Sequence, residues 1–555
     1  MPNFIESIFT QLKRAGDRVV LREVQGEGFT SVTGNELLAL TQRGRGYVRR
    51  FGLTPGDRCV LLGRNSIEWI AIDLALMAEG MVAVPLYARQ AIGELIGMMK
   101  DCQPSLLIVG EGDLVKGVAR EWKDRPHRVS TEEMLRISPA REAVTDGPSA
   151  RADRDLVTII YTSGTSGEAK GVCLNVENVT HMLKCTSERL DQLMGASRNP
   201  DRIFHYLPFN FAGSWILLLS CLARESVLTL STDLNRLADE IRVSSPNYFL
   251  NVPTLLERVK RGVLEGIAKR PAPIRMLFAR AKQSWERERE GRFGRLDGMD
   301  AFWLALGRRL IFGKIKKRFG NHLRALICGS APLAVETQEF FMMLGIPVLQ
   351  VYGLTETTAI CTMDNPAVAP EPGYVGQAIP GIEMDIAEHD EIVVRGPHIF
   401  PGYWNRSEET APVTKDGWFH TGDQGEKNKH GNWRIVGRIK NLIILNSGHN
   451  VAPEPIEERI GQVLRGAQQV VVVGNGRGFL SALITGDVAV GSAQKALDTV
   501  NADLPHYRQV RNFTVLPNIF MADDGLLTAN GKLRREAIDR RFSAEIAAMY
   551  GGRAH

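Results

Sequence analysis

A loop rich in glycine and hydroxyl residues constrains this chain more than any other segment. Asp155–Tyr161 (DLVTIIY) places β-branched residues beside an aromatic, which is typical of a buried strand. The ten residues that follow, 162–171 (TSGTSGEAKG), contain three glycines, four hydroxyl side chains and Lys170. Glycines let backbone N–H groups converge on one anion, hydroxyls donate to phosphate oxygens, and lysine adds a mobile positive charge. We therefore predict a phosphate-binding loop.

This loop differs from the P-loop of nucleotide triphosphatases. That motif requires GxxxxGK followed by Ser or Thr, whereas here Ala169 precedes Lys170 and Gly171 follows it. The next residues, Val172–Leu174, have the pattern of a strand and not of a helix. The sequence therefore predicts a phosphate loop that joins two strands. The alternative, an ordinary surface loop, rarely combines so many hydroxyls with a preceding buried strand.

The sequence pattern predicts an α/β fold. In residues 1–150, apolar runs at Arg58–Leu62, Val82–Pro85 and Leu106–Val109 read as buried strands, and Ile67–Met81 reads as a helix between two of them. This alternation is typical of a parallel sheet covered by helices. After Pro380, glycine, proline and short β-like runs increase.

The 555 residues are too many for one small core and predict at least two domains. We expect a large N-terminal domain of helix-covered mixed sheets with a β-rich subdomain, over residues 1–438. A small α+β domain is expected over residues 442–555.

Composition excludes several classes of protein. Hydrophobic residues make up 44% and charged residues 24% of the chain, as in ordinary soluble globular proteins. No segment approaches the roughly 18 apolar residues needed to span a bilayer. The start of the chain shows no secretory signal and reads as an amphipathic helix. The seven cysteines form no CxxC pair, so we expect neither a zinc site nor disulfides, and we expect a cytoplasmic setting.

Positive charge is concentrated in one segment. Residues 258–324 contain 19 Lys and Arg against 6 acidic residues, although the whole chain has a net charge of only +5. Within it, Ala301–Gly320 mixes bulky apolar and basic residues at helical spacing. This pattern fits a solvated helix packed on the core, or peripheral contact with an anionic membrane or a polyanionic substrate. No nucleic-acid recognition motif accompanies the charge, so nucleic acid is not an expected partner.

The glycine-rich loop resembles a known family signature. Tyr161–Gly171 (YTSGTSGEAKG) is similar to the signature of the adenylate-forming (ANL) superfamily, which includes acyl-CoA synthetases, luciferases and adenylation domains of nonribosomal peptide synthetases. Val252–Glu257, the long basic insertion after it and Gly448–Glu457 most resemble long-chain fatty acyl-CoA synthetases. The resemblance implies ATP, Mg²⁺ and coenzyme A as cofactors and co-substrates, and a hydrophobic acid as substrate.

Further motifs follow in the family's order. By resemblance, Tyr352 stacks on adenine, Asp423 accepts hydrogen bonds from the ribose hydroxyls, and Arg438 contacts ribose or phosphate. The nucleotide-binding residues implied in this way are Thr162, Ser163, Gly164, Thr165, Ser166, Gly167, Lys170, Gly329, Ser330, Ala331, Pro332, Gln350, Tyr352, Gly353, Thr355, Asp423, Arg438, Asn450 and Lys532. Thr165 and Glu356 are the implied metal residues, because a carboxylate beside a triphosphate needs a bridging cation.

The resemblance also assigns the chemistry. Lys532, in the segment Thr528–Lys532, is the implied adenylation lysine, with Glu356 and Lys170 as further catalytic residues. The resemblance also implies that residues 439–441 form a hinge, with Lys440 as the hinge residue, and that the C-terminal domain is mobile. Further along the chain, the residues implied to contact coenzyme A are Ser447, Gly448 and His449.

The acid pocket is expected near Phe209, Phe211 and Trp215. Phe211 stands where many relatives have a gating histidine, so this region departs from the family pattern. The three aromatics could close a narrow channel, accept a rigid polycyclic acid, or simply belong to the core.

Three alternatives remain open. The acyl group could pass to a carrier-protein thiol instead of coenzyme A, and the acid could be an aryl or terpenoid acid instead of a fatty acid. A degenerate, non-catalytic nucleotide-binding protein is disfavoured, because the charged residues that the chemistry needs are all present.

Overall fold

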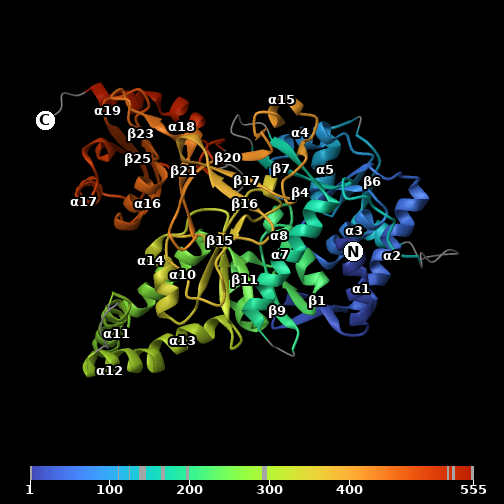
Figure 1. Ribbon diagram of the computed structural model, residues 1–555, viewed down its shortest axis with the longest axis horizontal. Coiled ribbons are helices and arrows are strands. Elements are labelled where there is room, and N and C mark those ends of the chain that lie inside the picture. The colour runs from blue at the N-terminus through green and yellow to red at the C-terminus, as the bar shows by residue number, and fades with distance from the viewer. Residues whose placement is uncertain are drawn as a thin grey trace.

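The structure is a computed structural model, and it describes residues 3–110, 112–123, 125–136, 146–163, 169–195, 199–290, 297–521, 524–527 and 532–551. Figure 1 shows a body of sheets and helices, with the last hundred or so residues forming a separate orange and red group at the upper left. Among the described residues, none of the helices combines the length and apolar character needed to cross a bilayer.

The largest sheet has nine strands, with parallel pairing through its centre. Its order is β15-β14-β13-β12-β11-β9-β10-β1-β2. The strands are β1 (Val19–Gln25), β2 (Gly28–Thr33), β9 (Asp201–His205), β10 (Ser226–Leu230), β11 (Tyr248–Asn251), β12 (Ala325–Cys328), β13 (Val348–Tyr352), β14 (Thr362–Met363) and β15 (Gln377–Ala378).

The second sheet has seven strands in the order β18-β8-β7-β4-β3-β5-β6. They are β3 (Arg58–Gly63), β4 (Val82–Tyr87), β5 (Leu106–Val109), β6 (Arg128–Ser130), β7 (Leu156–Ser163), β8 (Ala169–Asn175) and β18 (Gly402–Tyr403). Strands β3, β4, β5 and β6 pair in parallel, and β7 and β8 pair antiparallel. The expected parallel sheet and the expected strand–loop–strand hairpin are therefore both present.

Helices cover these two sheets because the apolar faces of the sheets need burial. The first helix, α1, buries the predicted apolar side: Phe4, Ile5, Ile8, Phe9 and Leu12. Helices α3 and α8 are apolar on all sides and lie in the core between the sheets. The helices of this part are α1 (Phe4–Ala15), α2 (Gly34–Phe51), α3 (Ile67–Ala78), α4 (Ile92–Cys102), α5 (Gly112–Glu121), α6 (Thr131–Arg136), α7 (Val176–Met194), α8 (Ala212–Ala223), α9 (Leu237–Ser244) and α14 (Val335–Met343).

A β-rich part follows, as the increase in glycine, proline and short β-like runs after Pro380 predicted. It has five strands in one sheet: β16 (Glu383–Ile386), β17 (Glu391–Arg395), β19 (Thr414–Lys415), β20 (Trp418–Lys427) and β21 (Trp433–Arg438). The short helix α15 (Ser407–Thr410) lies within this part of the chain. Strand β21 ends at Arg438 and leads through a 3₁₀ turn, Ile439–Asn441, into the C-terminal residues.

The residues after 441 have apolar clusters of their own. Their elements are β22 (Ile443–Ile444), β23 (Asn450–Val451), α16 (Glu454–Val463), β24 (Ala467–Val473), β25 (Leu480–Gly486), α17 (Val490–Asn501), β26 (Val510–Leu516), α18 (Arg535–Arg541) and α19 (Ser543–Gly551). A separate core is typical of a domain, and the mobility of this unit stays a prediction. The exact hinge at 439–441 stays a prediction.

The basic segment forms an arm. Helices α10 (Pro253–Ala268), α11 (Ala272–Glu290), α12 (Gly298–Gly307) and α13 (Gly313–Lys316) project at the lower left of Figure 1. A π-helical turn, Arg308–Phe312, joins α12 to α13. The predicted helical spacing of Ala301–Gly320 is therefore present.

Candidate active site

The site lies in a cleft of about 2520 Å³ between the sheets and the C-terminal unit. Fifteen of the residues predicted for the nucleotide site, the chemistry and the hinge line it: Thr162, Lys170, Gly329, Ser330, Ala331, Pro332, Gln350, Tyr352, Gly353, Thr355, Glu356, Asp423, Arg438, Lys440 and Lys532. The turn residues Gly164, Thr165, Ser166 and Gly167 lie outside the described residues, and Ser163 ends strand β7.

A carboxylate with two partners occupies one wall of this cleft. Asp423 and Arg438 are cross-strand partners in β20 and β21, and Arg438 Nε lies 2.8 Å from Asp423 Oδ1. The Tyr352 hydroxyl, at the end of β13, donates to Asp423 Oδ2 at 2.9 Å. Desolvation raises the pKa of Asp423, and the charge of Arg438 opposes that rise. The chain thus holds a buried carboxylate ready to accept hydrogen bonds from a polar ligand.

Close backbone packing fixes the turn that follows Tyr352. A Cβ on Gly353 would stand only 2.2 Å from the carbonyl oxygen of Ala359, so no larger residue fits there. After β12, Ser330 has a φ of 74°, a left-handed conformation that non-glycine residues adopt at a cost. Both turns stand at the carboxyl ends of neighbouring parallel strands, the usual ligand-binding edge of an α/β sheet.

A lysine, an aromatic ring and a carboxylate meet on the opposite wall. The Lys170 ammonium lies 5.1 Å from the centre of the Tyr403 ring and forms an ion pair with Glu409. The Tyr403 hydroxyl donates to Glu356 Oε1 at 2.8 Å. Sequence reasoning missed Tyr403 and Glu409; the only sequence signal was the aromatic run Tyr403-Trp404 after a glycine.

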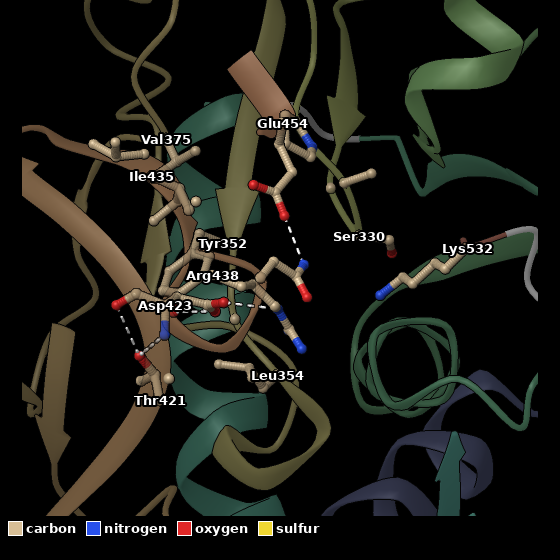
Figure 2. Close-up of a pocket in the computed structure, with 18 of the residues that line it drawn as sticks. Ser330, Tyr352, Leu354, Val375, Thr421, Asp423, Ile435, Arg438, Glu454 and Lys532 are labelled. Atoms are coloured by element: carbon tan, nitrogen blue, oxygen red, sulfur yellow. Dashed lines mark hydrogen bonds and ion pairs between the residues drawn. The ribbon is translucent and has the colours of Figure 1, made fainter. Parts of the chain in front are cut away.

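Lys532 reaches the same cleft from the C-terminal unit. Figure 2 shows its side chain pointing toward the group formed by Tyr352, Asp423 and Arg438. Desolvation by the cleft walls and the neighbouring Arg438 lower the pKa of Lys532, while Asp423 and Glu356 oppose that change. Lys440 is affected similarly: desolvation and then Arg438 lower its pKa to about 8. Several cations therefore share a small volume, which suits a polyanionic ligand.

Part of the cleft lining is mainly apolar, and we name this part the tunnel. Its lining includes Leu190, Phe211, Gly213, Ile216, Leu217, Leu250, Ile327 and Ile360, together with the polar residues Thr186, Asn210 and Ser214. Of the three predicted acid-pocket aromatics, only Phe211 lines the cavity. Phe209 and Trp215 are buried in the core: Phe209 stacks on His205 at 5.0 Å, and Trp215 Nε1 donates to Asp73 at 2.8 Å.

The residues expected to contact coenzyme A do not line this cleft. Ser447, Gly448 and His449 form the turn between β22 and β23, and Asn450 begins β23. The Ser447 hydroxyl lies 3.0 Å from His449 Nδ1, and the His449 ring stacks on Tyr507 at 4.3 Å. In this arrangement of the chain, Lys532 lines the cleft and this turn does not.

The described residues contain no group of three or more His, Cys, Asp or Glu side chains able to hold a metal ion. Glu356 lines the cleft beside Tyr403, and Glu409 of the same group is paired with Lys170. Mg²⁺ usually needs only one or two protein carboxylates, because phosphate oxygens and water complete its coordination. The residues present therefore fit a magnesium ion that arrives with a triphosphate.

The fold and the cleft define a two-part nucleotide-dependent enzyme of the adenylate-forming type. Residues 8–404 match the family described as AMP-binding enzyme, and residues 440–554 match the AMP-binding enzyme C-terminal domain. The chain belongs to the AMP-binding enzyme family. The recognition made from the glycine-rich loop and the motifs after it is confirmed.

Several known proteins are similar to most or all of this chain. The long-chain-fatty-acid–CoA ligase FadD15 of Mycobacterium bovis is 27% identical over 99% of this chain and 97% of its own length. The putative fatty-acid–CoA ligase fadD11 of Mycobacterium tuberculosis is 30% identical over 71% of this chain and 74% of its own. The ATP-bound structure of MatB from Rhodopseudomonas palustris superposes with a TM-score of 0.74, at 23% identity, covering 98% of this chain and 99% of that one.

Proposed function

We propose that this protein is an AMP-forming acyl-CoA synthetase for hydrophobic carboxylic acids. It joins an acid to ATP, releasing pyrophosphate and giving an acyl-adenylate, and then transfers the acyl group to the thiol of coenzyme A. The observation that carries the proposal is the meeting of Lys532 with the Tyr352–Asp423–Arg438 group in one cleft. The full-length similarity to fatty-acid–CoA ligases supports the ligase class.

The first step joins two anions, so the protein must reduce their repulsion. Lys532 is proposed to stand between the substrate carboxylate and the α-phosphate. The carboxylate oxygen forms a bond to the α-phosphorus as the bond to the pyrophosphate oxygen breaks, and the pyrophosphate leaves with its electron pair. Bound Mg²⁺ supplies charge neutralisation at the phosphates, and Glu356 is the residue proposed to hold it. Lys170 adds a positive charge on the same side once it is released from Glu409.

Asp423 and Tyr352 are proposed to position the nucleoside. Asp423 already accepts hydrogen bonds from two protein donors and is 4% exposed, so ribose hydroxyls would compete for an acceptor held in place by β20. Arg438 has room to move, since its side chain is 40% exposed. This positioning role contributes to the rate by holding the α-phosphorus in line with the acid.

In the second step the thiol sulfur attacks the acyl carbonyl and AMP leaves. The Ser447–His449 turn lies away from the cleft, so we propose that rotation of the C-terminal unit at Lys440 brings it in and carries Lys532 out. The two half-reactions would then use two arrangements of one chain.

The substrate is proposed to be a fatty or similar hydrophobic acid, because the tunnel lining is mostly apolar, although Thr186, Asn210 and Ser214 also line it. Aryl and terpenoid acids remain second candidates, since Phe211 lines the same tunnel. A cytoplasmic setting also stays a proposal; its support is that all seven cysteines are free and buried.

The test is a pyrophosphate-release screen of the purified protein with saturated fatty, aryl and terpenoid acids, followed by thioester detection with coenzyme A or a holo carrier protein. We expect acid-dependent pyrophosphate release and a thioester with coenzyme A. ATP binding without turnover of any acid would point to the degenerate binding protein, and thioester formation only on the carrier would point to carrier loading.

A further inference from the structure

Lys170, the cation of the predicted phosphate loop, is paired with a carboxylate of this chain. Its ammonium group forms an ion pair with Glu409 of the short helix α15, and both side chains are only partly exposed, 23% for Lys170 and 36% for Glu409. The hydrogen bond from Lys170 lowers the pKa of Glu409, and slight desolvation opposes that shift. A charged carboxylate therefore lies beside the cation expected to bind phosphate.

Two further contacts hold Glu409 in this place. Arg406, three residues before it, approaches Glu409 Oε1 to 3.3 Å with its Nη1 atom. The Nη2 atom of Arg406 lies 3.4 Å from Asp101 of α4, and the other oxygen of Asp101 accepts a hydrogen bond from Tyr161 at 2.6 Å. Because Tyr161 lies in β7 and Lys170 in β8, these contacts connect α15 to both strands of the glycine-rich hairpin, at the top of Figure 1.

The carboxylate proposed to hold Mg²⁺ is coupled to the same group. Lys170 lies over the Tyr403 ring, and the Tyr403 hydroxyl donates to Glu356 at 2.8 Å. The backbone N–H of Tyr403 donates to Thr410 Oγ1 at 3.0 Å, one residue beyond Glu409. Movement of Lys170 would therefore change the surroundings of both Glu356 and Glu409.

We propose that Glu409 competes with the phosphates of ATP for Lys170. Carboxylate and phosphate oxygens are the same kind of acceptor for an ammonium group, so each weakens the hold of the other on one lysine. ATP replaces Glu409 as the partner of Lys170, and Glu409 takes the lysine back when pyrophosphate leaves. Glu409 is thus a positioning residue that lowers the affinity for ATP and for pyrophosphate, and it favours release of that product.

The alternative role for the Lys170–Glu409 pair is to stabilise the hairpin. Partly exposed ion pairs contribute little to stability, and a carboxylate beside a phosphate site repels the ligand. A purely structural role therefore gives little benefit at this position, whereas competition uses the repulsion. The inference rests on the proposed function in one respect, that Lys170 contacts the phosphates of ATP.

The experiment compares the full-length wild-type chain with Glu409→Gln, with Mg²⁺–ATP and pyrophosphate as probes and isothermal titration calorimetry as the measurement. The amide of glutamine cannot form an ion pair with Lys170 and does not repel phosphate. We therefore expect Glu409→Gln to bind both probes roughly three- to tenfold more tightly than wild type. Damage to the fold would weaken binding, so a gain in affinity is specific to competition.

The matched control is Glu408→Gln, which removes the same charge from the neighbouring, exposed position and should bind ATP like wild type. Lys170→Met should weaken ATP binding. In the Lys170→Met background, Glu409→Gln should give a clearly smaller gain than in wild type, because the ion pair that it breaks is absent there. Thermal unfolding checks that each variant is folded.

The inference is overturned if Glu409→Gln binds ATP no more tightly than wild type, or if its gain is as large in the Lys170→Met background. Weaker ATP binding by Lys170→Met alone would leave the proposed function standing in either case. A chain that binds ATP but activates no acid would overturn the proposed function, while the comparison of affinities would still decide the role of Glu409.

Discussion

Lys532 is the residue on which the proposed division of labour depends. Lys532→Ala removes the cation proposed to lie between the two anionic reactants, so adenylate formation should fall by at least about 100-fold. Thioester formation from a supplied acyl-adenylate should stay within a few fold of wild type, because Lys532 has to leave for that step. Pyrophosphate exchange and thioester production, measured separately, check this; equal loss of both would contradict it. Lys429→Ala, an exposed lysine away from the cleft, is the control.

A second prediction concerns Asp73, which is fully buried beside Trp215. Desolvation raises the pKa of Asp73 to about 7, and the hydrogen bond from Trp215 opposes the rise. A carboxyl whose pKa is higher in the folded than in the unfolded state binds a proton on folding, so its presence destabilises the fold increasingly as pH rises toward 7.

Asp73→Asn removes that penalty, because an amide keeps an acceptor for Trp215 without a charge. The stability gain of Asp73→Asn over wild type should therefore be larger at pH 8 than at pH 5, by at most roughly 3 kcal/mol. Urea unfolding at the two pH values measures it. A gain that does not change with pH would show that Asp73 is not the titrating group.

At the scale of elements, helix α8 decides what the tunnel admits. Gly213 lies in its first turn and lines the tunnel, and a Cβ there would stand 3.9 Å from the nearest atom, on Leu250. Alanine therefore fits, whereas a phenyl ring would project into the tunnel.

We expect Gly213→Phe to lower kcat/KM for long acids by roughly 100-fold while leaving short acids and ATP binding nearly unchanged. Gly213→Ala is the matched control and should behave like wild type. Steady-state kinetics over a series of chain lengths tests this. A uniform loss across all chain lengths would place the tunnel elsewhere.

For the whole molecule, an ion pair between described residues links the C-terminal unit to the main body in the observed arrangement. Arg534 lies two residues after Lys532, and its guanidinium is 3.0 Å from Glu94 of α4. The pair is partly exposed, so its own contribution to stability is small. Because the two residues are in contact here, rotation of the C-terminal unit would separate them, and a covalent link between them would prevent that rotation.

A Glu94→Cys/Arg534→Cys variant joined by a short bismaleimide should keep adenylate formation and lose thioester formation by about tenfold or more. The seven native cysteines are buried, which favours selective reaction of the two new thiols. Each single-cysteine variant treated with the same reagent is the control. Full thioester formation in the linked protein would contradict rotation of the unit.

Much of the fold was predictable from the sequence because local patterns were strong. The strand at Leu106–Val109 matches the predicted range, and the hairpin around the glycine-rich loop follows from two adjoining strand patterns. Element ends were less accurate: the predicted helix Ile67–Met81 ends at Ala78. Cooperative pairing with neighbours, and not local composition, sets such ends.

The sequence alone determined the order of the chemical groups along the chain. These are a phosphate loop, a motif with Tyr352 and Glu356, the carboxylate of Asp423 and, near the end, Lys532. Only the tertiary structure decided which of them meet. Tyr403 joined Lys170 to Glu356, Phe209 and Trp215 went into the core, and the Ser447–His449 turn stayed outside the cleft. The physical reason is that motif residues reveal their chemistry locally, whereas burial and proximity depend on how sheets distant in the chain pack against one another.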